Sequence, residues 1–291
     1  MYPLITVYLP THNRKDLVPR AANSVLAQDY DNFELIIVND GSYDDTKAIL
    51  DKFYGNNPKV RIIHLEEPKG ACHARNIAIK VANGKLITGI DDDDEFLPHR
   101  LSSLYENYDE SYAFVCSGYL WNYGYKTRER FVNERKIDLN DILSLNEASN
   151  QVLVKTSRLE EIGGFDQTLV ACQDYDLWVR LISKYGDALR IKNATYIAHV
   201  GHEKERISNT KNRLLGYSQF FEKHKNLMNE KNITNQGFLR IVANEEKLSS
   251  IGLLQQIKAG YPILKLRYFI SSRFKYLAML RKRYLKHGKM S

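Results

Sequence analysis

The sequence has no apolar run long enough to cross a bilayer, and its first residues lead us to expect no secretion signal. Before a strand-like segment at residues 4–9 there is no basic stretch and no small-residue cleavage site. Only three cysteines occur, Cys72, Cys116 and Cys172, and their number and spacing fit neither a disulfide framework nor a metal site. We therefore expect a cytoplasmic protein whose cysteines have no catalytic role.

Carboxylates are missing from the C-terminal part of the chain. No acidic residue follows Glu246, whereas eleven lysines and arginines lie between Lys247 and Ser291. Subtracting these eleven charges from the formal net charge of +7 leaves −4 for residues 1–246. This segregation predicts an anionic partner for the tail, either a membrane surface or a nucleic acid.

The first hundred residues alternate between strand and helix patterns. Short apolar runs predict strands at residues 4–9, 33–38, 60–65 and 85–90, separated by helices at 15–28, 44–53 and 71–82. Such repeats form a mainly parallel sheet with flanking helices, an α/β fold that binds ligands beyond the carboxyl ends of its strands. Later segments predict an antiparallel excursion at 112–155, a helix at 174–185, a strand at 194–198 and a helix at 206–226.

Four consecutive aspartates, Asp91 to Asp94, follow the fourth predicted strand. Carboxylates so close together disfavour joint ionisation in a dry interior. A divalent cation with a phosphate-bearing ligand would make the arrangement favourable, since Mg²⁺ and Mn²⁺ are usually held by one or two carboxylates plus phosphates. A solvated acidic turn is the alternative for an isolated run. Polar residues also end the first two strands, at 10–14 and 39–42, and the three strand ends share one edge, which favours the functional interpretation.

Five segments resemble motifs of the family 2 inverting glycosyltransferases, which have the GT-A fold. They are residues 5–14 (ITVYLPTHNR), 35–42 (LIIVNDGS), Gly70 with Ala74-Arg75-Asn76, 90–95 (IDDDDE) and 173–181 (QDYDLWVRL). The resemblance covers roughly residues 4–220, and bacterial members that build O-antigen or capsule repeat units look most similar. It implies a catalytic domain at 1–230, with a nucleotide-binding half at 1–110 and an acceptor-binding half at 111–230. Residues 231–291 would form a basic helical extension.

The resemblance also implies which residues hold a nucleotide sugar. The loop after the first strand would contribute Pro10, Thr11, Asn13 and Arg14. Asp40 would contact the nucleotide base, and Gly70 and Arg75 would lie beside the phosphates. On its own, Asp40-Gly41 is equally compatible with a simple turn, and Ser42 or Asp44 with a helix N-cap.

Within the acidic run the family spacing makes Asp91 and Asp93 the paired aspartates. Asp91 would then face the ribose and Asp93 the metal, Mn²⁺ or Mg²⁺, with Asp94 as a further ligand or support. Four identical residues leave the register open by one position, and Asp92, assigned to the nucleotide, could be a spare carboxylate. The polar segment at 199–208 suggests His202 as a metal ligand, with Arg206 and Ser208 nearby and His199 as the alternative.

Asp174 is the expected catalytic base. A single-displacement transfer needs a carboxylate that takes a proton from the acceptor hydroxyl, and the helix dipole keeps a carboxylate ionised in the first helical turn. Asp176 competes for this role. Gln173 stands where the family commonly has Glu, and we assign Gln173 and Trp178 to the acceptor.

The basic tail shows apolar residues at helical spacing, including Leu266, Ile270 and Leu277. A basic amphipathic helix can lie on an anionic leaflet, so we expect peripheral association with the inner face of the cell membrane. The alternative is a helix packed on the catalytic domain. Nucleic acid is not expected, because no recognised binding motif accompanies the charge.

The expected activity is therefore metal-dependent transfer from a UDP-sugar to a glycan or polyprenyl-diphosphate-linked acceptor. A nucleotidyltransferase would normally carry a glycine-rich loop after the first strand, and residues 10–14 contain no glycine. A catalytically silent binding or scaffold protein on the same fold is the alternative from another class.

Overall fold

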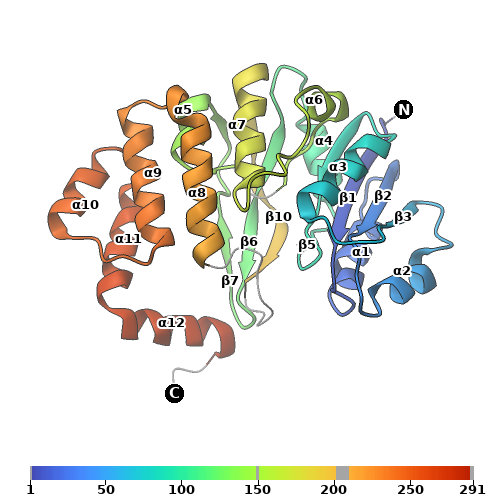
Figure 1. Ribbon diagram of the computed structural model, residues 1–291, viewed down its shortest axis with the longest axis horizontal. Helices are drawn as coiled ribbons and strands as arrows, with labels where there is room; N and C mark the ends of the chain where they lie inside the picture. The colour runs from blue at the N-terminus through green and yellow to red at the C-terminus, as the bar shows by residue number, and fades with distance from the viewer. Residues whose placement is uncertain (1, 149–150, 201–209, 289–291) are drawn as a thin grey trace.

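The computed structural model describes residues 2–148, 151–200 and 210–288. A first sheet has the strand order β3-β2-β1-β4-β9, and its strands β1, β2 and β3 are labelled in Figure 1. Its strands are β1 (Ile5–Thr11), β2 (Phe33–Asn39), β3 (Val60–His64), β4 (Leu86–Gly89) and the short β9 (Val154–Lys155). Strands β1 to β4 are parallel, and β9 pairs antiparallel with β4. The four strands predicted for the N-terminal part are thus confirmed.

Helices cover both faces of this sheet because its strands are apolar on both sides. On one face α1 (Val18–Leu26), α2 (Thr46–Tyr54) and α4 (Arg100–Glu106) pack on inward residues such as Val7 and Leu35. On the other face α3 (Ala71–Val81) packs on Tyr8 and Ile36, and α7 (Gln173–Tyr185) belongs to the same hydrophobic core. Helix α1 is shorter than predicted and has a proline in its first turn, the position where proline is tolerated.

A second sheet has the order β5-β10-β6-β7, and β8 also pairs with β10. Its members are β5 (Glu95–Phe96), β6 (Val115–Asn122), β7 (Thr127–Arg130), β8 (Arg135–Ile137) and β10 (Ala188–His199). The antiparallel excursion is confirmed for β6 and β7, but β6 pairs parallel with β10, a partner distant in the sequence. Sequence patterns also missed α5 (Leu139–Ser144), although Asp138 and Asp141 form a capping box, and α6 (Thr156–Glu161).

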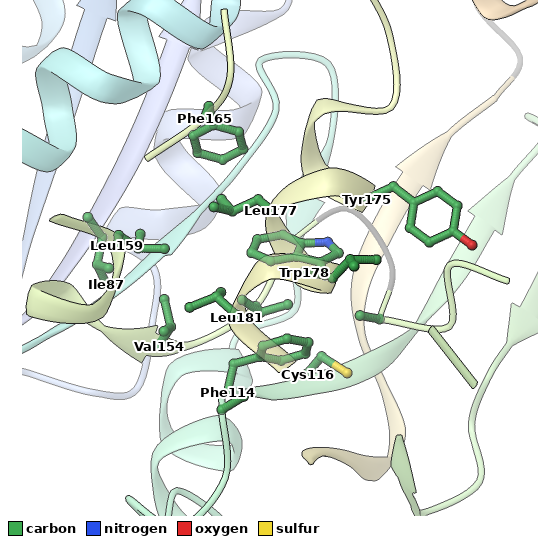
Figure 2. Close-up of a cluster of buried hydrophobic side chains, with 14 of the residues drawn as sticks. Ile87, Phe114, Cys116, Val154, Leu159, Phe165, Tyr175, Leu177, Trp178 and Leu181 are labelled. Carbon is green, nitrogen blue, oxygen red and sulfur yellow. The ribbon is translucent and has the colours of Figure 1, made fainter. Parts of the chain in front are cut away.

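Helix α7 is anchored in the larger hydrophobic core between the two sheets. Figure 2 shows Trp178, Leu177 and Leu181 of this helix surrounded by apolar side chains from β4, β6, β9 and α6. The Trp178 ring lies 5.5 Å from Phe114 and 6.4 Å from Phe165, measured between ring centroids. This packing fixes the first turn of α7 relative to the first sheet.

The C-terminal part is helical. It comprises α8 (Thr210–His224), a 3₁₀ turn (Lys225–Leu227), α9 (Glu230–Ala243), α10 (Ser250–Ile257), α11 (Pro262–Arg273) and α12 (Lys275–His287). Helix α9 is bonded to the body, because the Asn232 and Gln236 amides donate to Ser144 Oγ and Leu143 O. Helices α10 to α12 lie beyond it, and α12 runs back beneath β7 (Figure 1). Among the described residues no helix is both long and apolar enough to span a membrane.

Candidate active site

The ends of β1 and β2 are joined by hydrogen bonds, as the parallel register requires. The Asp40 amide donates to Thr11 O at 2.8 Å, and the His12 ring nitrogen Nδ1 lies 2.6 Å from Asp40 O. Asn13 adopts a left-handed φ of 53°, and its amide donates to Ser42 Oγ at 2.9 Å. The predicted nucleotide loop is therefore held against the end of β2.

Asp40 clamps a third segment. Its two carboxylate oxygens accept the backbone N–H groups of Lys69 and Gly70 at 2.8 and 2.7 Å. Gly41 must be glycine, because its φ is +60° and a Cβ there would lie 2.4 Å from Pro68 N. The N-cap of α2 is Asp45 rather than Ser42 or Asp44, although Asp44 accepts the Thr46 amide. Asp40 itself positions the loop that begins α3.

The four aspartates of the acidic run have different surroundings. Asp91 Oδ1 accepts from Arg75 at 2.9 Å and from the Gln151 amide at 3.1 Å. Asp94 is buried, and it accepts from Tyr196 Oη at 2.8 Å and from the His199 amide at 2.9 Å. Burial raises the pKa of Asp94 well above its ordinary range. Of the two roles open to Asp94, these bonds favour support over ligation.

Asp92 and Asp93 lie between these two. Burial, with smaller contributions from the charges of Asp93 and Asp91, raises the pKa of Asp92 to about 7 against the opposing effects of Thr11 and Arg14. Arg14 Nε lies 3.9 Å from Asp92 Oδ1, and Arg20 donates to the carbonyl of Asp93. The register within the run thus stays open between Asp92 and Asp93 for the metal.

The donor set suits a hard cation. The buried carboxylate of Asp92, whose pKa burial and its acidic neighbours raise to about 7, gains from a nearby positive charge, and Mg²⁺ needs only one or two carboxylates with phosphates. No group of three or more His, Cys, Asp or Glu side chains arranged for a metal occurs among the described residues. The substrate phosphates would have to complete the coordination.

Asp174 lies in the first turn of α7 and within electrostatic reach of the acidic run. Burial raises the pKa of Asp174 to about 6, the Tyr175 amide and Arg75 lower it, and Asp91 raises it. Arg75, which is bonded to Asp91, therefore influences both carboxylates. The predicted base and the predicted donor site share one electrostatic environment.

Asp176 does not compete with Asp174 for the role of base. Its carboxylate is fully buried and lies 2.8 Å from each of Arg180, Lys223 and His224. A carboxylate engaged by three cationic or hydrogen-bonding partners inside the protein cannot reach an acceptor. Asp176 instead ties α7 to α8.

The acceptor assignment of Trp178 is wrong, because its side chain is only 1% exposed and packs in the core. Local periodicity placed Trp178 on the apolar face of the helix, and that face turns away from the site. Gln173 is half-buried and donates to Leu169 O at 3.1 Å. Its acceptor role stays a prediction.

His199 contacts two acidic residues next to the site, Asp94 and Glu95. Its Nε2 lies 2.6 Å from Glu95 Oε1, and burial, followed by the charge of Arg20, lowers its pKa. His202, with Arg206 and Ser208, lies outside the described residues, so its metal role stays a prediction.

Sequence patterns missed three residues that shape the site. Gln151 bonds both Tyr8 and Asp91, Tyr196 bonds Asp94, and Arg20 bonds the Asp93 carbonyl and lies 3.4 Å from Glu95. Each comes from a segment far from its partner in the sequence, and no local pattern marks it.

The fold and site together define a glycosyltransferase of the GT-A fold. The model of glycosyl transferase family 2 matches residues 6–165, and the chain belongs to this family. WcaA of Escherichia coli K12, described as a colanic acid biosynthesis glycosyl transferase, is 36% identical over 233 residues, covering 77% of this chain and 82% of WcaA.

Solved structures show the same fold. S. aureus TarS (residues 1–349) in complex with UDP-GlcNAc superposes with a TM-score of 0.65 at 20% identity, over 98% of this chain and 88% of that chain. The Pyrobaculum calidifontis mannosyltransferase PcManGT, in complex with GDP-Man and Mn²⁺, gives 0.57 at 16% identity, over 95% and 88%.

Proposed function

We propose that this glycosyltransferase is a metal-dependent, inverting enzyme of surface polysaccharide (O-antigen or capsule) biosynthesis. It takes a sugar from a UDP-hexose or UDP-N-acetylhexosamine and transfers it to a hydroxyl of a glycan or polyprenyl-diphosphate-linked acceptor. The observation that carries the proposal is the position of Asp174, a carboxylate whose pKa is raised by burial and which lies within electrostatic reach of Arg75 and Asp91 of the donor site. The colanic acid role described for WcaA supports the assignment to polysaccharide synthesis.

The donor would bind across the three joined strand ends. The loop at Pro10, Thr11, Asn13 and Arg14 forms one wall, and Asp40 holds the facing segment at Lys69 and Gly70. Each Asp40 carboxylate oxygen accepts one backbone N–H group and keeps a further lone pair for a donor on a pyrimidine or ribose edge. The UDP-GlcNAc bound by TarS supports a UDP-sugar, although GDP-Man in PcManGT shows that the fold takes other nucleotides.

The diphosphate of the donor would lie beside the acidic run. Asp93, with Asp91 or Asp92, supplies carboxylates for Mn²⁺ or Mg²⁺, which when bound neutralises charge on the leaving diphosphate. Arg75 already neutralises Asp91 at 2.9 Å, so the run does not repel phosphate as four bare charges would.

Asp174 would accept the proton of the acceptor hydroxyl. Its pKa of about 6 leaves the carboxylate mostly ionised at neutral pH yet makes it a stronger base than an ordinary aspartate. Because α7 is anchored in the core, its first turn holds the carboxylate in place (Figure 2). Inversion follows if the hydroxyl attacks directly, with no protein nucleophile between donor and acceptor.

The tail helices have the surface that membrane association requires. Large apolar residues of α10 to α12 are exposed, including Leu254 at 66%, Ile263 at 67% and Leu277 at 61%. Exposed lysines and arginines lie among them on the same helices, as on interfacial helices. We therefore place the enzyme at the inner face of the cell membrane, where lipid-linked acceptors would be presented.

The competing function is a silent binding protein on the same fold. Such a protein has no reason to keep a carboxylate with a raised pKa beside the acidic run. Incubation with UDP-sugars and Mn²⁺, with detection of released UDP, tests the proposal. Release from one UDP-sugar that disappears in Asp93→Ala supports it, and binding without turnover of any nucleotide sugar contradicts it.

A further inference from the structure

Strand β6 carries a strip of aromatic rings that continues onto basic residues of β7. Tyr119, Trp121 and Tyr123 alternate along the chain and so share one face, with ring centroids 6.0 and 6.2 Å apart. In the antiparallel register Arg130 stands opposite Tyr119 and Arg128 opposite Trp121. The Arg130 guanidinium lies 4.1 Å from the centroid of the Trp121 ring.

Helices α11 and α12 each bring one further arginine to this strip, Arg267 and Arg281. The Lys126 amide in the β6–β7 turn donates to Leu285 O at 3.1 Å, and the rings of Tyr125 and Tyr284 are 6.0 Å apart. Burial lowers the pKa of Arg281 in α12. The charges of Arg128, Arg267 and Arg130 lower it further, so these three guanidinium groups lie near that of Arg281. We call these four residues the arginine cluster.

The arginine cluster has no counter-charge in the described part of the protein. None of its four members takes part in a salt bridge or a side-chain hydrogen bond there, and Arg130 Nε is buried without a hydrogen-bond partner. Four like charges brought together by folding repel one another, and removing a buried N–H from water without a partner is also unfavourable. An anion bound at the cluster would relieve both.

The strip leads from the cluster toward the predicted base. Burial raises the pKa of Tyr119 to about 12, Arg130 lowers it and Asp174 raises it, so the phenol is within electrostatic reach of both groups. Aromatic faces such as those of Tyr119 and Trp121 provide apolar stacking surface next to polar tips. The same region therefore offers a place for an anion, a place for a sugar ring and a proton acceptor.

We propose that the arginine cluster binds the diphosphate of a lipid-linked acceptor, and that the aromatic strip holds the attached sugar on its way to Asp174. This inference rests on the proposed function. Guanidinium groups match phosphate oxygens with paired, charge-assisted hydrogen bonds, which explains four arginines in this place rather than dispersed lysines. The donor diphosphate is assigned elsewhere, to the edge at Asp91 to Asp93.

The test is calorimetry of the full-length protein with farnesyl diphosphate, a soluble diphosphate lipid, in EDTA so that the donor site cannot bind it through a metal. The variant is the double substitution Arg130→Gln and Arg281→Gln. The matched control is Lys282→Gln with Arg283→Gln, which removes the same charge from α12 at two residues outside the arginine cluster. We expect about tenfold weaker binding for each arginine of the cluster that is removed, and no change in the control.

Two further readouts separate the explanations. The cluster variant should unfold at the same or a higher temperature, because repulsion is removed, and it should keep its UDP affinity in Mn²⁺. Equal farnesyl diphosphate affinity in variant and wild type overturns the inference. So does loss of sedimentation with phosphatidylglycerol vesicles while farnesyl diphosphate binding persists, since the arginines would then meet lipid headgroups. If wild type binds farnesyl diphosphate through the cluster but binds no UDP-sugar, the proposed function fails and the anion site stands.

Discussion

Replacing Asp174 by Asn tests the proposed base, because it keeps the shape of the side chain and removes the proton acceptor. Loss of a positioned general base commonly costs about 10²–10⁴-fold in rate. In wild type, with a pKa of about 6, kcat/KM for transfer should fall roughly tenfold between pH 7 and pH 5 as the free enzyme is protonated. The variant should show low transfer with no such pH dependence, while UDP-sugar binding in Mn²⁺ persists. The assay is transfer of radiolabelled sugar from UDP-sugars to polyprenyl-diphosphate-linked acceptors.

The same substitution has a stability signature. The folded protein holds the Asp174 proton more tightly than the unfolded chain, with a pKa raised from 3.8 to about 6. The stability that this proton contributes is therefore present below about pH 4 and is lost as pH rises through about 6. The full shift corresponds to about 3 kcal/mol, which partial exposure reduces to about 1–2 kcal/mol. Relative to wild type, Asp174→Asn should gain this amount between pH 4 and pH 7, measured as urea unfolding free energy.

Asp176→Asn is the control, because it should lower stability and leave sugar transfer intact. Its buried carboxylate pairs with Arg180 and Lys223 and lies 2.8 Å from His224 Nε2, so the variant should lose about 3–5 kcal/mol of stability. Below its unfolding temperature it should still transfer sugar. The reasoning is refuted if Asp174→Asn transfers at near wild-type rate while folded Asp176→Asn is inactive. A product that keeps the donor's anomeric configuration would refute the single-displacement mechanism itself.

Three other substitutions test neighbouring parts of the argument. Asp93→Ala should abolish Mn²⁺-dependent UDP affinity in calorimetry without lowering the unfolding temperature, and undiminished binding would exclude Asp93 as the metal ligand. Replacing Lys282 and Arg283 by Gln should weaken sedimentation with anionic vesicles, since each cation near the surface contributes about 1 kcal/mol. Unchanged sedimentation would mean that these two residues do not face the membrane. Gly41→Ala should cost several kcal/mol in thermal unfolding and weaken nucleotide binding, because the new Cβ would lie 2.4 Å from Pro68 N; a wild-type unfolding curve would contradict the strain argument.

The donor side of the site could be predicted from the sequence, because each of its parts is marked by a short local pattern of residues. The strand that precedes Asp91 is an apolar run, and the residues that follow each strand end become neighbours through the parallel register alone. For the same reason the start of α7 at Gln173 was predicted within one residue. The assignment of Trp178 to the acceptor was wrong because a place on the apolar face of a helix indicates that a side chain is buried, not that it borders the acceptor site.

The acceptor side depends on contacts between distant segments and could not be predicted. The parallel pairing of β6 with β10 joins residues more than sixty positions apart, and no residue pattern in either strand predicts which strand it pairs with. Helix α12 is docked on the β6–β7 turn by a backbone hydrogen bond, and a pattern of side chains does not predict such a contact. The basic tail was recognised by its charge, but its convergence with Arg128 and Arg130 exists only in the folded protein.

Helix α3 contacts both the donor side and the acceptor side of the site. Arg75 pairs with Asp91 of the donor side, and its guanidinium lies 5.2 Å from the ring of Phe165 on the acceptor side. The next residue, Asn76, donates to Phe165 O and accepts from Phe165 N, both at 2.8 Å. A shift of α3 that followed nucleotide binding at Gly70 would therefore move Arg75 relative to both Asp91 and Asp174. Because Arg75 lowers the pKa of Asp174, the strength of the base depends on how the donor side is arranged.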